Sequence, residues 1–194
     1  MKNKLFAVLI LSYFHFQLIS QSSFYARLSD SAVKLTMQRV NYDPTYFSIK
    51  YPNGDVPSGK GVCTDVIIRA YRKLGIDLQK EVHEDMQANF NLYPKNWSMK
   101  TTDKNIDHRR VSNLMVFFSR FGIVKSNSVK AIDYQPGDIV CWNLGGATTH
   151  IGLVVKQKSN DGKRHLIVHN IGAGQVMEDC LFKCKIIGHY NYQK

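Results

Sequence analysis

The sequence predicts an α+β fold, with helices in the first two thirds of the chain and an antiparallel sheet in the last third. In several segments before residue 122, apolar residues recur at steps of three and four, which is typical of amphipathic helices. From Gln135 onward, short apolar runs alternate with turn residues, which is typical of strands. Helices first and consecutive strands later favour an α+β domain.

Length and composition indicate one globular domain. The chain has 194 residues, of which 44% are hydrophobic and 21% charged, and it contains no internal repeat or low-complexity tract. We therefore predict a single domain over residues 21–194, and expect it to be monomeric.

Residues 1–20 have the layout of a secretory signal. Lys2 and Lys4 form a basic start, residues 5–19 are mostly apolar, and Ser20 offers a cleavage point. The apolar run is shorter than the ~20 residues needed to cross a bilayer, so cleavage is favoured over an uncleaved anchor. We expect an exported protein, periplasmic or extracellular, with no stable membrane span after cleavage.

The net charge of +11 makes the chain strongly basic, and removal of residues 1–20 takes away only two lysines. No basic helix with interleaved aromatic residues is visible, so we do not predict nucleic-acid binding. In an exported protein, the charge points to an anionic partner of the cell envelope, such as peptidoglycan or another cell-wall polymer. A generally solvated basic surface is the alternative.

The predicted helices follow one another along the first 122 residues. A helix over residues 21–41 has one apolar side, and a run of turn signals over residues 42–60 separates it from the next helix. That second helix begins at Cys63 and stops at Gly75. Two more are expected at 78–90 and 111–121, the last closed by Gly122. The apolar side of the first helix comprises Phe24, Leu28, Ala32, Leu35 and Val40.

The predicted strands start after the turn at Pro136 and Gly137. Their approximate ranges are 139–142, 150–155, 166–169, 175–177 and 185–192. Cys141 lies within the first of these runs and is expected in the core. Cys180 and Cys184 are close enough in sequence to form a small disulfide loop, and the sequence leaves their state open.

Cys63 is the candidate nucleophile. Gly59 and Gly61 precede it, and helical spacing follows, so it is predicted in the first turn of a helix. Unpaired backbone N–H groups and the positive end of the helix dipole favour a thiolate at this position. The same spacing puts Cys63 on the apolar helix face with Val66, so a buried structural cysteine is the alternative.

His150 and His169 are candidates for the base and for the group that orients it. One opens a predicted strand and the other ends the next strand. The two rings share a face of this hairpin only if even positions of the first strand oppose odd positions of the second. A cysteine with two histidines could also bind zinc, but no closely spaced ligand pair is present, so no metal or cofactor is predicted.

Asp107, His108, Arg109 and Arg110 precede the helix at 111–121. Cations are unfavourable near the start of a helix, which suggests a ligand for them. The two arginines could bind a substrate carboxylate, with His108 beside them and Asn170 completing the substrate-binding set. A solvated basic turn is the alternative.

Taken in order, these motifs resemble those of NlpC-type cell-wall peptidases, the bacterial branch of the papain-like cysteine peptidases. The resemblance covers residues 51–170. Residues 107–110 and 172–175 are similar, more narrowly, to a bacterial envelope family of unassigned function within that superfamily. The chain departs from the pattern by having Val62-Cys63-Thr64-Asp65 in place of Asp-Cys-Ser-Gly, and by a longer spacing between the histidines. The motifs that carry the resemblance are Cys63 at a helix start, Tyr71-Arg-Lys-Leu-Gly-Ile76, Gln135-Pro-Gly-Asp-Ile139, His150-Ile-Gly-Leu-Val154 and Ile167-Val-His169.

The resemblance implies a papain-like fold, with N-terminal helices packed on a C-terminal antiparallel sheet. It implies that Cys63 is the nucleophile, His150 the general base and His169 the orienting residue, while Tyr51 supports the oxyanion region. The expected activity is hydrolysis of an amide in peptidoglycan, within the stem peptide or between stem and sugar. A non-catalytic envelope binding protein and an acyl or thioester transferase on the same fold are the alternatives.

Overall fold

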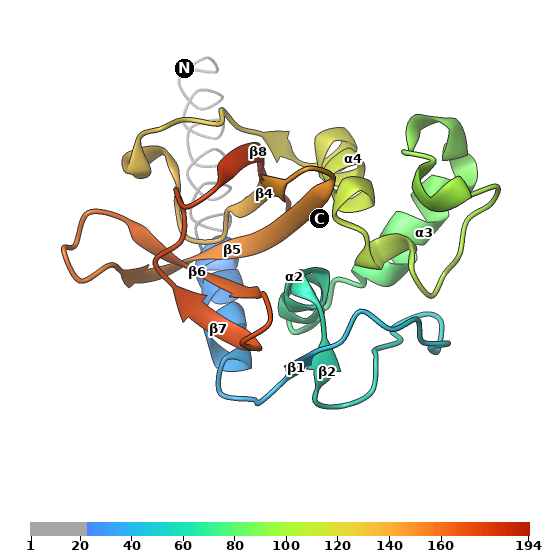
Figure 1. Cartoon of the computed structure of the whole chain (residues 1–194), viewed down its shortest axis with the longest axis horizontal. Helices are drawn as coiled ribbons and strands as arrows, with labels where there is room; N and C mark the ends of the chain where they lie inside the picture. Colours follow the sequence, from blue (N-terminus) through green and yellow to red (C-terminus); the bar gives the residue numbers. More distant parts are fainter. Residues whose placement is uncertain (1–22) are drawn as a thin grey trace, which may run out of the picture.

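The computed structural model describes residues 23–194 and confirms an α+β fold with an antiparallel sheet. The predicted secretory signal lies outside these residues. In Figure 1, α3 and α4 lie to the right, the large sheet lies to the left, and α2 lies between them. The helices are residues 23–35, α2 (Cys63–Arg72), α3 (Leu78–Ala88) and α4 (Val111–Phe121), with 3-10 turns at Phe90–Leu92, Asn96–Ser98, Asp107–Arg109 and Ala131–Asp133.

The strands form one large sheet and one small parallel pair. In the large sheet the order is β3-β8-β4-β5-β6-β7, and every neighbouring pair is antiparallel. β4 to β7 form a meander, and β8 returns to the other side of β4. The strands are β1 (Asn41–Tyr42), β2 (Lys60–Gly61), β3 (Ile123–Val124), β4 (Ile139–Gly145), β5 (Thr148–Lys158), β6 (His165–Asn170), β7 (Gln175–Glu178) and β8 (Lys185–Asn191).

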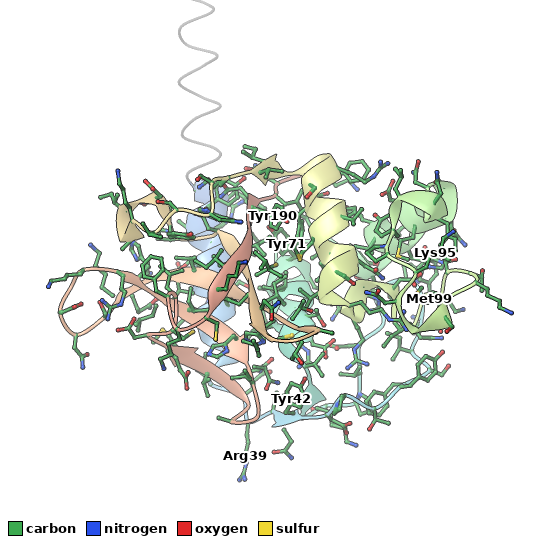
Figure 2. All side chains as sticks on the ribbon, turned by 45° about the horizontal axis from the view of Figure 1, so that its top comes forward. Arg39, Tyr42, Tyr71, Lys95, Met99 and Tyr190 are labelled. Atoms are coloured by element: carbon green, nitrogen blue, oxygen red, sulfur yellow. The ribbon has the colours of Figure 1, made fainter. Side chains whose placement is uncertain are left out.

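The helices pack on one face of the sheet, where odd-numbered residues of β5 meet α2, α4 and the first helix in the main core. Tyr71 and Tyr190 lie inside this core, as Figure 2 shows, and the Tyr71 hydroxyl donates to the Tyr192 carbonyl. The predicted apolar side of the first helix is buried, but the helix ends at residue 35 and not at 41, so Val40 is buried beyond its end. A smaller cluster covers the opposite face and comprises Tyr134, Val140, Trp142, Val154, Ile167 and Leu181.

The sequence prediction omitted β1, β2 and β3, each of which has two residues. Such short elements carry too few residues to show a period. The parallel pair matters for the site, because it places Tyr42 opposite Gly61, two residues before Cys63. Over residues 23–194, no helix has both the length and the apolar character that crossing a membrane requires.

Candidate active site

The start of α2 lies beside the end of β5 that is not paired with β6. Val154 exchanges backbone hydrogen bonds with Asp138 and Gly137 on the β4 side. Because bonding directions alternate along an antiparallel strand, the N–H of Ile151 points to the other side, toward β6. β6 has no register partner at Ile151, and the backbone of Ile151 instead hydrogen-bonds to the Cys63 thiol. The sulfur therefore lies beside the residue that follows His150.

β6 contacts the chain just before Cys63. The Asn170 side-chain amide donates to the Gly61 carbonyl at 3.1 Å. Gly61 is also in close contact with α2, because a Cβ atom there would lie 3.3 Å from a carboxylate oxygen of Asp65. Asn170 is buried, so the structure places it as a support for the chain before Cys63, although it was predicted to bind substrate.

His150 and His169 lie on the same face of the sheet, as the predicted hairpin parity required. Val154 pairs with Ile167, so even residues of β5 oppose odd residues of β6. His150 Nε2 lies 2.8 Å from His169 Nδ1, and both side chains are buried. Within residues 23–194, no hydrogen bond occupies the remaining nitrogen of His150, Nδ1.

Glu178 lies next to the second histidine of this pair and determines which ring nitrogens carry the protons. His169 Nε2 lies 3.3 Å from Glu178 Oε2. A carboxylate only accepts hydrogen bonds, so His169 carries its proton on Nε2 and leaves Nδ1 bare. His150 must then donate from Nε2, which leaves an acceptor lone pair on His150 Nδ1. The sequence analysis missed Glu178, although it stands at the end of a predicted strand beside His169.

Burial of the Cys63 thiol opposes the thiolate that the start of a helix was expected to favour. Burial raises the pKa of Cys63 to about 11, although the backbone hydrogen bonds from Ile151, Thr64 and Cys63 itself act in the opposite direction. Burial also lowers the pKa of His150 to about 4, with His169 adding to the effect. A buried site disfavours both the Cys63 thiolate and the protonated, charged His150 ring. We therefore expect proton transfer from Cys63 to accompany its attack on the substrate.

An opening of ≈ 260 Å³ gives access to Cys63. Tyr42 lines it, and Thr148 and Thr149 lead to His150. Burial raises the pKa of Tyr42, and the nearby Cys63 adds to the effect. The Tyr42 hydroxyl therefore stays protonated and can donate a hydrogen bond. Four larger hollows of ≈ 410 to ≈ 530 Å³ lie elsewhere, but none of them is lined by a cysteine or histidine, so the smaller opening is the candidate site.

Tyr51, the predicted site tyrosine, lies against α3. Its ring packs on His83 and its hydroxyl donates to Glu84 at 3.4 Å. Tyr42 lines the Cys63 opening instead, because the β1–β2 pairing brings it beside the start of α2. Figure 2 shows Tyr42 at the edge of the molecule. The family resemblance implied Tyr51, 12 residues before Cys63, whereas the tyrosine at the opening lies 21 residues before it.

Arg109 binds a carboxylate of this chain. Its Nε and Nη2 donate to the two oxygens of Asp65 at 3.0 and 3.1 Å, and both side chains are buried. Asp65 in turn accepts from the Val62 N–H at 2.7 Å, which fixes the start of α2. Arg109 thus holds the start of the helix that carries Cys63, and its Nε and Nη2 are already bonded to Asp65.

The neighbours of Arg109 differ in their access to the site. His108 is buried, and burial lowers its pKa to about 3, so it offers no charge to a substrate. Arg110 lines the Cys63 opening and also donates to the Met99 sulfur. Of the predicted substrate-binding residues, Arg109 and Arg110 both line the opening, and the Arg109 guanidinium is already paired with Asp65.

The chain belongs to the family described as "Domain of unknown function (DUF1287)", whose family model matches residues 29–192. It is 48% identical over 165 residues to the uncharacterized protein YijF of Escherichia coli (strain K12), an alignment that covers 85% of this chain and 80% of YijF. No solved structure matches the chain.

Proposed function

We propose that this member of the family is an exported cysteine-dependent amide hydrolase with a papain-like arrangement, acting on peptidoglycan. One observation carries the proposal: the start of α2 holds the Cys63 sulfur beside β5, where His150 leaves Nδ1 unoccupied and is hydrogen-bonded through Nε2 to His169. A nucleophile, a base and an orienting group in this order are what thiol catalysis requires.

The proposed reaction begins with a neutral thiol. His150 Nδ1 takes the proton of Cys63 as the sulfur attacks the amide carbonyl carbon. The Cys63 backbone N–H and the Tyr42 hydroxyl donate to the oxyanion that forms. His150 then gives the proton to the leaving amine, and the carbon–nitrogen bond breaks to leave a thioester on Cys63. Water, deprotonated by His150, attacks the thioester and releases the acid and the thiol.

Peptidoglycan is proposed as the substrate on chemical grounds. Its stem peptides and the junction of stem and sugar supply amides, and an envelope location follows from the predicted secretory signal. The peptides also carry carboxylates, which the Arg110 guanidinium at the opening could bind. The net charge of +11 favours association with an anionic polymer.

Digestion of purified peptidoglycan tests this proposal. The residue-23-to-194 domain should release soluble fragments whose masses show the gain of one water per cleaved amide. Cys63→Ala should abolish the release, while Cys141→Ala, which removes a fully buried thiol that does not line the opening, should retain it. Equal release by Cys63→Ala and wild-type protein would overturn the proposal.

The alternatives give different products. A transferase would yield fragments in which an acyl group has moved to an amine, with no water gained. A binding protein would co-sediment with peptidoglycan and release nothing. No observation of the site favours either of these over hydrolysis, since the neutral histidine pair can activate water as readily as an amine.

A further inference from the structure

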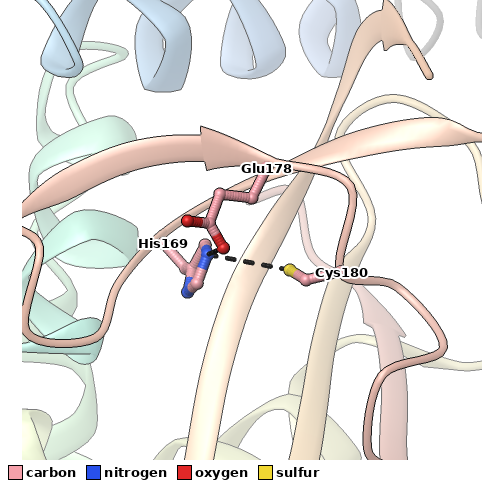
Figure 3. A group of neighbouring side chains, drawn as sticks. All are labelled: His169, Glu178 and Cys180. Carbon is pink, nitrogen blue, oxygen red and sulfur yellow. Dashed lines mark hydrogen bonds and ion pairs between the residues drawn. The ribbon is translucent and has the colours of Figure 1, made fainter. Parts of the chain in front are cut away.

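His169 also belongs to a second cluster of reactive side chains, which does not line the Cys63 opening. His169 Nε2, Glu178 Oε2 and Cys180 Sγ point toward one another, as Figure 3 shows. Among the described residues, this is the one group of three or more His, Cys, Asp or Glu side chains whose ligand atoms lie close enough to share a metal ion. We propose that these three residues bind a thiophilic divalent ion of the zinc type, and that the bound ion switches off the candidate base His150.

The strand register accounts for the cluster. Glu178 opposes Ile167 on the neighbouring strand, so it lies on the same face as His169, two residues along. Cys180 follows β7 and lies 3.6 Å from His169 Nε2. Three ligands from two adjacent strands and the turn after them are therefore held by the sheet itself.

The spacing fits tetrahedral coordination. Zinc lies about 2.0 Å from nitrogen and oxygen ligands and about 2.3 Å from sulfur, so tetrahedral angles put nitrogen and oxygen about 3.3 Å apart, and nitrogen and sulfur about 3.5 Å apart. The observed separations from His169 Nε2 are 3.3 Å to Glu178 Oε2 and 3.6 Å to Cys180 Sγ. All three ligand atoms lie within 4.8 Å of one another.

The donor set selects the kind of ion. Thiolate and imidazole ligands favour zinc and similar ions over Mg²⁺ and Ca²⁺, which prefer oxygen. Glu178 is 40% exposed and Cys180 is half-buried, so an ion can reach the cluster from solvent. None of the three residues lines the Cys63 opening, so the ion needs no access through it.

Binding would reverse the proton arrangement of the histidine pair. The ion takes the lone pair of His169 Nε2, so the His169 proton moves to Nδ1 and is donated to His150 Nε2. His150 then carries its own proton on Nδ1 and cannot accept the proton of Cys63. Both rings stay neutral, and the one proton released to solvent is that of the Cys180 thiol, replaced by the metal–sulfur bond.

Cobalt absorption tests the site without relying on any activity. Co²⁺ added to the full chain in oxygen-free buffer should give a thiolate-to-cobalt charge-transfer band in the near ultraviolet. Cys180→Ser should remove this band, and Glu178→Gln should weaken Co²⁺ binding at least about tenfold, because even outer-shell changes cost 10–100-fold in affinity. Far-ultraviolet circular dichroism checks that each variant is folded.

Two matched thiol variants keep the test specific. Cys63→Ser and Cys184→Ser, the latter four residues from Cys180 and similarly half-buried, should both retain the band. Absence of the band in wild-type protein would overturn the proposal. So would a band that persists in Cys180→Ser and is lost in Cys63→Ser or Cys184→Ser.

The inhibitory consequence rests on the proposed hydrolase function and has a separate readout. Saturating Zn²⁺ should lower the wild-type rate of peptidoglycan cleavage more than tenfold. In Cys180→Ser, the Zn²⁺ concentration for half inhibition should rise at least tenfold relative to wild type. Unchanged inhibition in Cys180→Ser would place the inhibitory ion at Cys63 and overturn this consequence, whereas the cobalt band tests the site even in a protein without hydrolase activity.

Discussion

Two buried histidine networks on the same sheet differ in how many ring nitrogens have hydrogen-bond partners within the fold. His189 uses both ring nitrogens within the fold, with Nε2 2.7 Å from Asp138 and Nδ1 2.9 Å from the Ser126 carbonyl. Among residues 23–194, His150 has a hydrogen-bond partner on Nε2, namely His169, and none on Nδ1. A closed network can only stabilise the fold, whereas a network with an unoccupied nitrogen can also accept a proton.

The closed network should have the larger effect on stability. Asp138 is fully buried and accepts from Lys125, His189 and Asn191. Asp138→Ala leaves these groups buried without their partner, so the free energy of unfolding should fall by about 3–5 kcal/mol. Urea titration followed by circular dichroism measures this change. A loss below about 1 kcal/mol would show that the network is not closed as described.

The open network should affect the rate of cleavage. His169→Ala removes the group that fixes the His150 tautomer, so kcat/KM on peptidoglycan fragments should fall about 100-fold, near the lower end of acid–base contributions. His169→Gln can still contact His150 Nε2 and should retain more activity than His169→Ala. Equal activity of His169→Ala and wild type would show that His169 does not orient His150 for catalysis.

The pH dependence of Cys63 alkylation tests the neutral resting state. Only a thiolate reacts with iodoacetamide, and the raised pKa of about 11 leaves Cys63 protonated at neutral pH. The alkylation rate should therefore rise about 100-fold from pH 7 to pH 9. Peptide mass mapping separates Cys63 from Cys180 and Cys184. A rate that stays flat over this interval would indicate a preformed thiolate.

Glu178 should have the smallest effect, because it is partly exposed and acts through His169. Glu178→Leu removes the acceptor for His169 Nε2, so kcat/KM should fall about tenfold, as the loss of a group that orients an active-site histidine does. Glu178→Gln keeps an acceptor oxygen and should lose less. The stability of both variants should change by less than about 1 kcal/mol. A larger loss of activity in Glu178→Gln than in Glu178→Leu would contradict the tautomer assignment.

Long periodic elements could be predicted from the sequence. The helix from Val111 to Phe121 and the start of α2 at Cys63 agree with the structure, because an amphipathic period over ten or more residues leaves little ambiguity. The hairpin parity of His150 and His169 could be stated as a condition, but it could not be decided until the register between Val154 and Ile167 was known.

The residues that sequence reasoning misplaced depend on long-range contacts. Tyr42 reaches the opening through a two-residue parallel strand, and Arg109 forms an ion pair with Asp65, 44 positions earlier in the chain. The Cys63 pKa was expected to fall, because the helix start was visible in the sequence and the depth of burial was not. Such effects follow from packing between distant segments, which local periodicity does not encode.

A double-mutant cycle tests most directly whether the open histidine network serves Cys63. Cleavage of peptidoglycan is measured for Cys63→Ala, His150→Ala and the double variant. When two residues act as one catalytic unit, replacing both lowers the activity about as much as replacing either one alone. The double variant should therefore fall within about threefold of Cys63→Ala. Losses that multiply in the double variant, or full activity in His150→Ala, would show that the thiol and the histidine work independently.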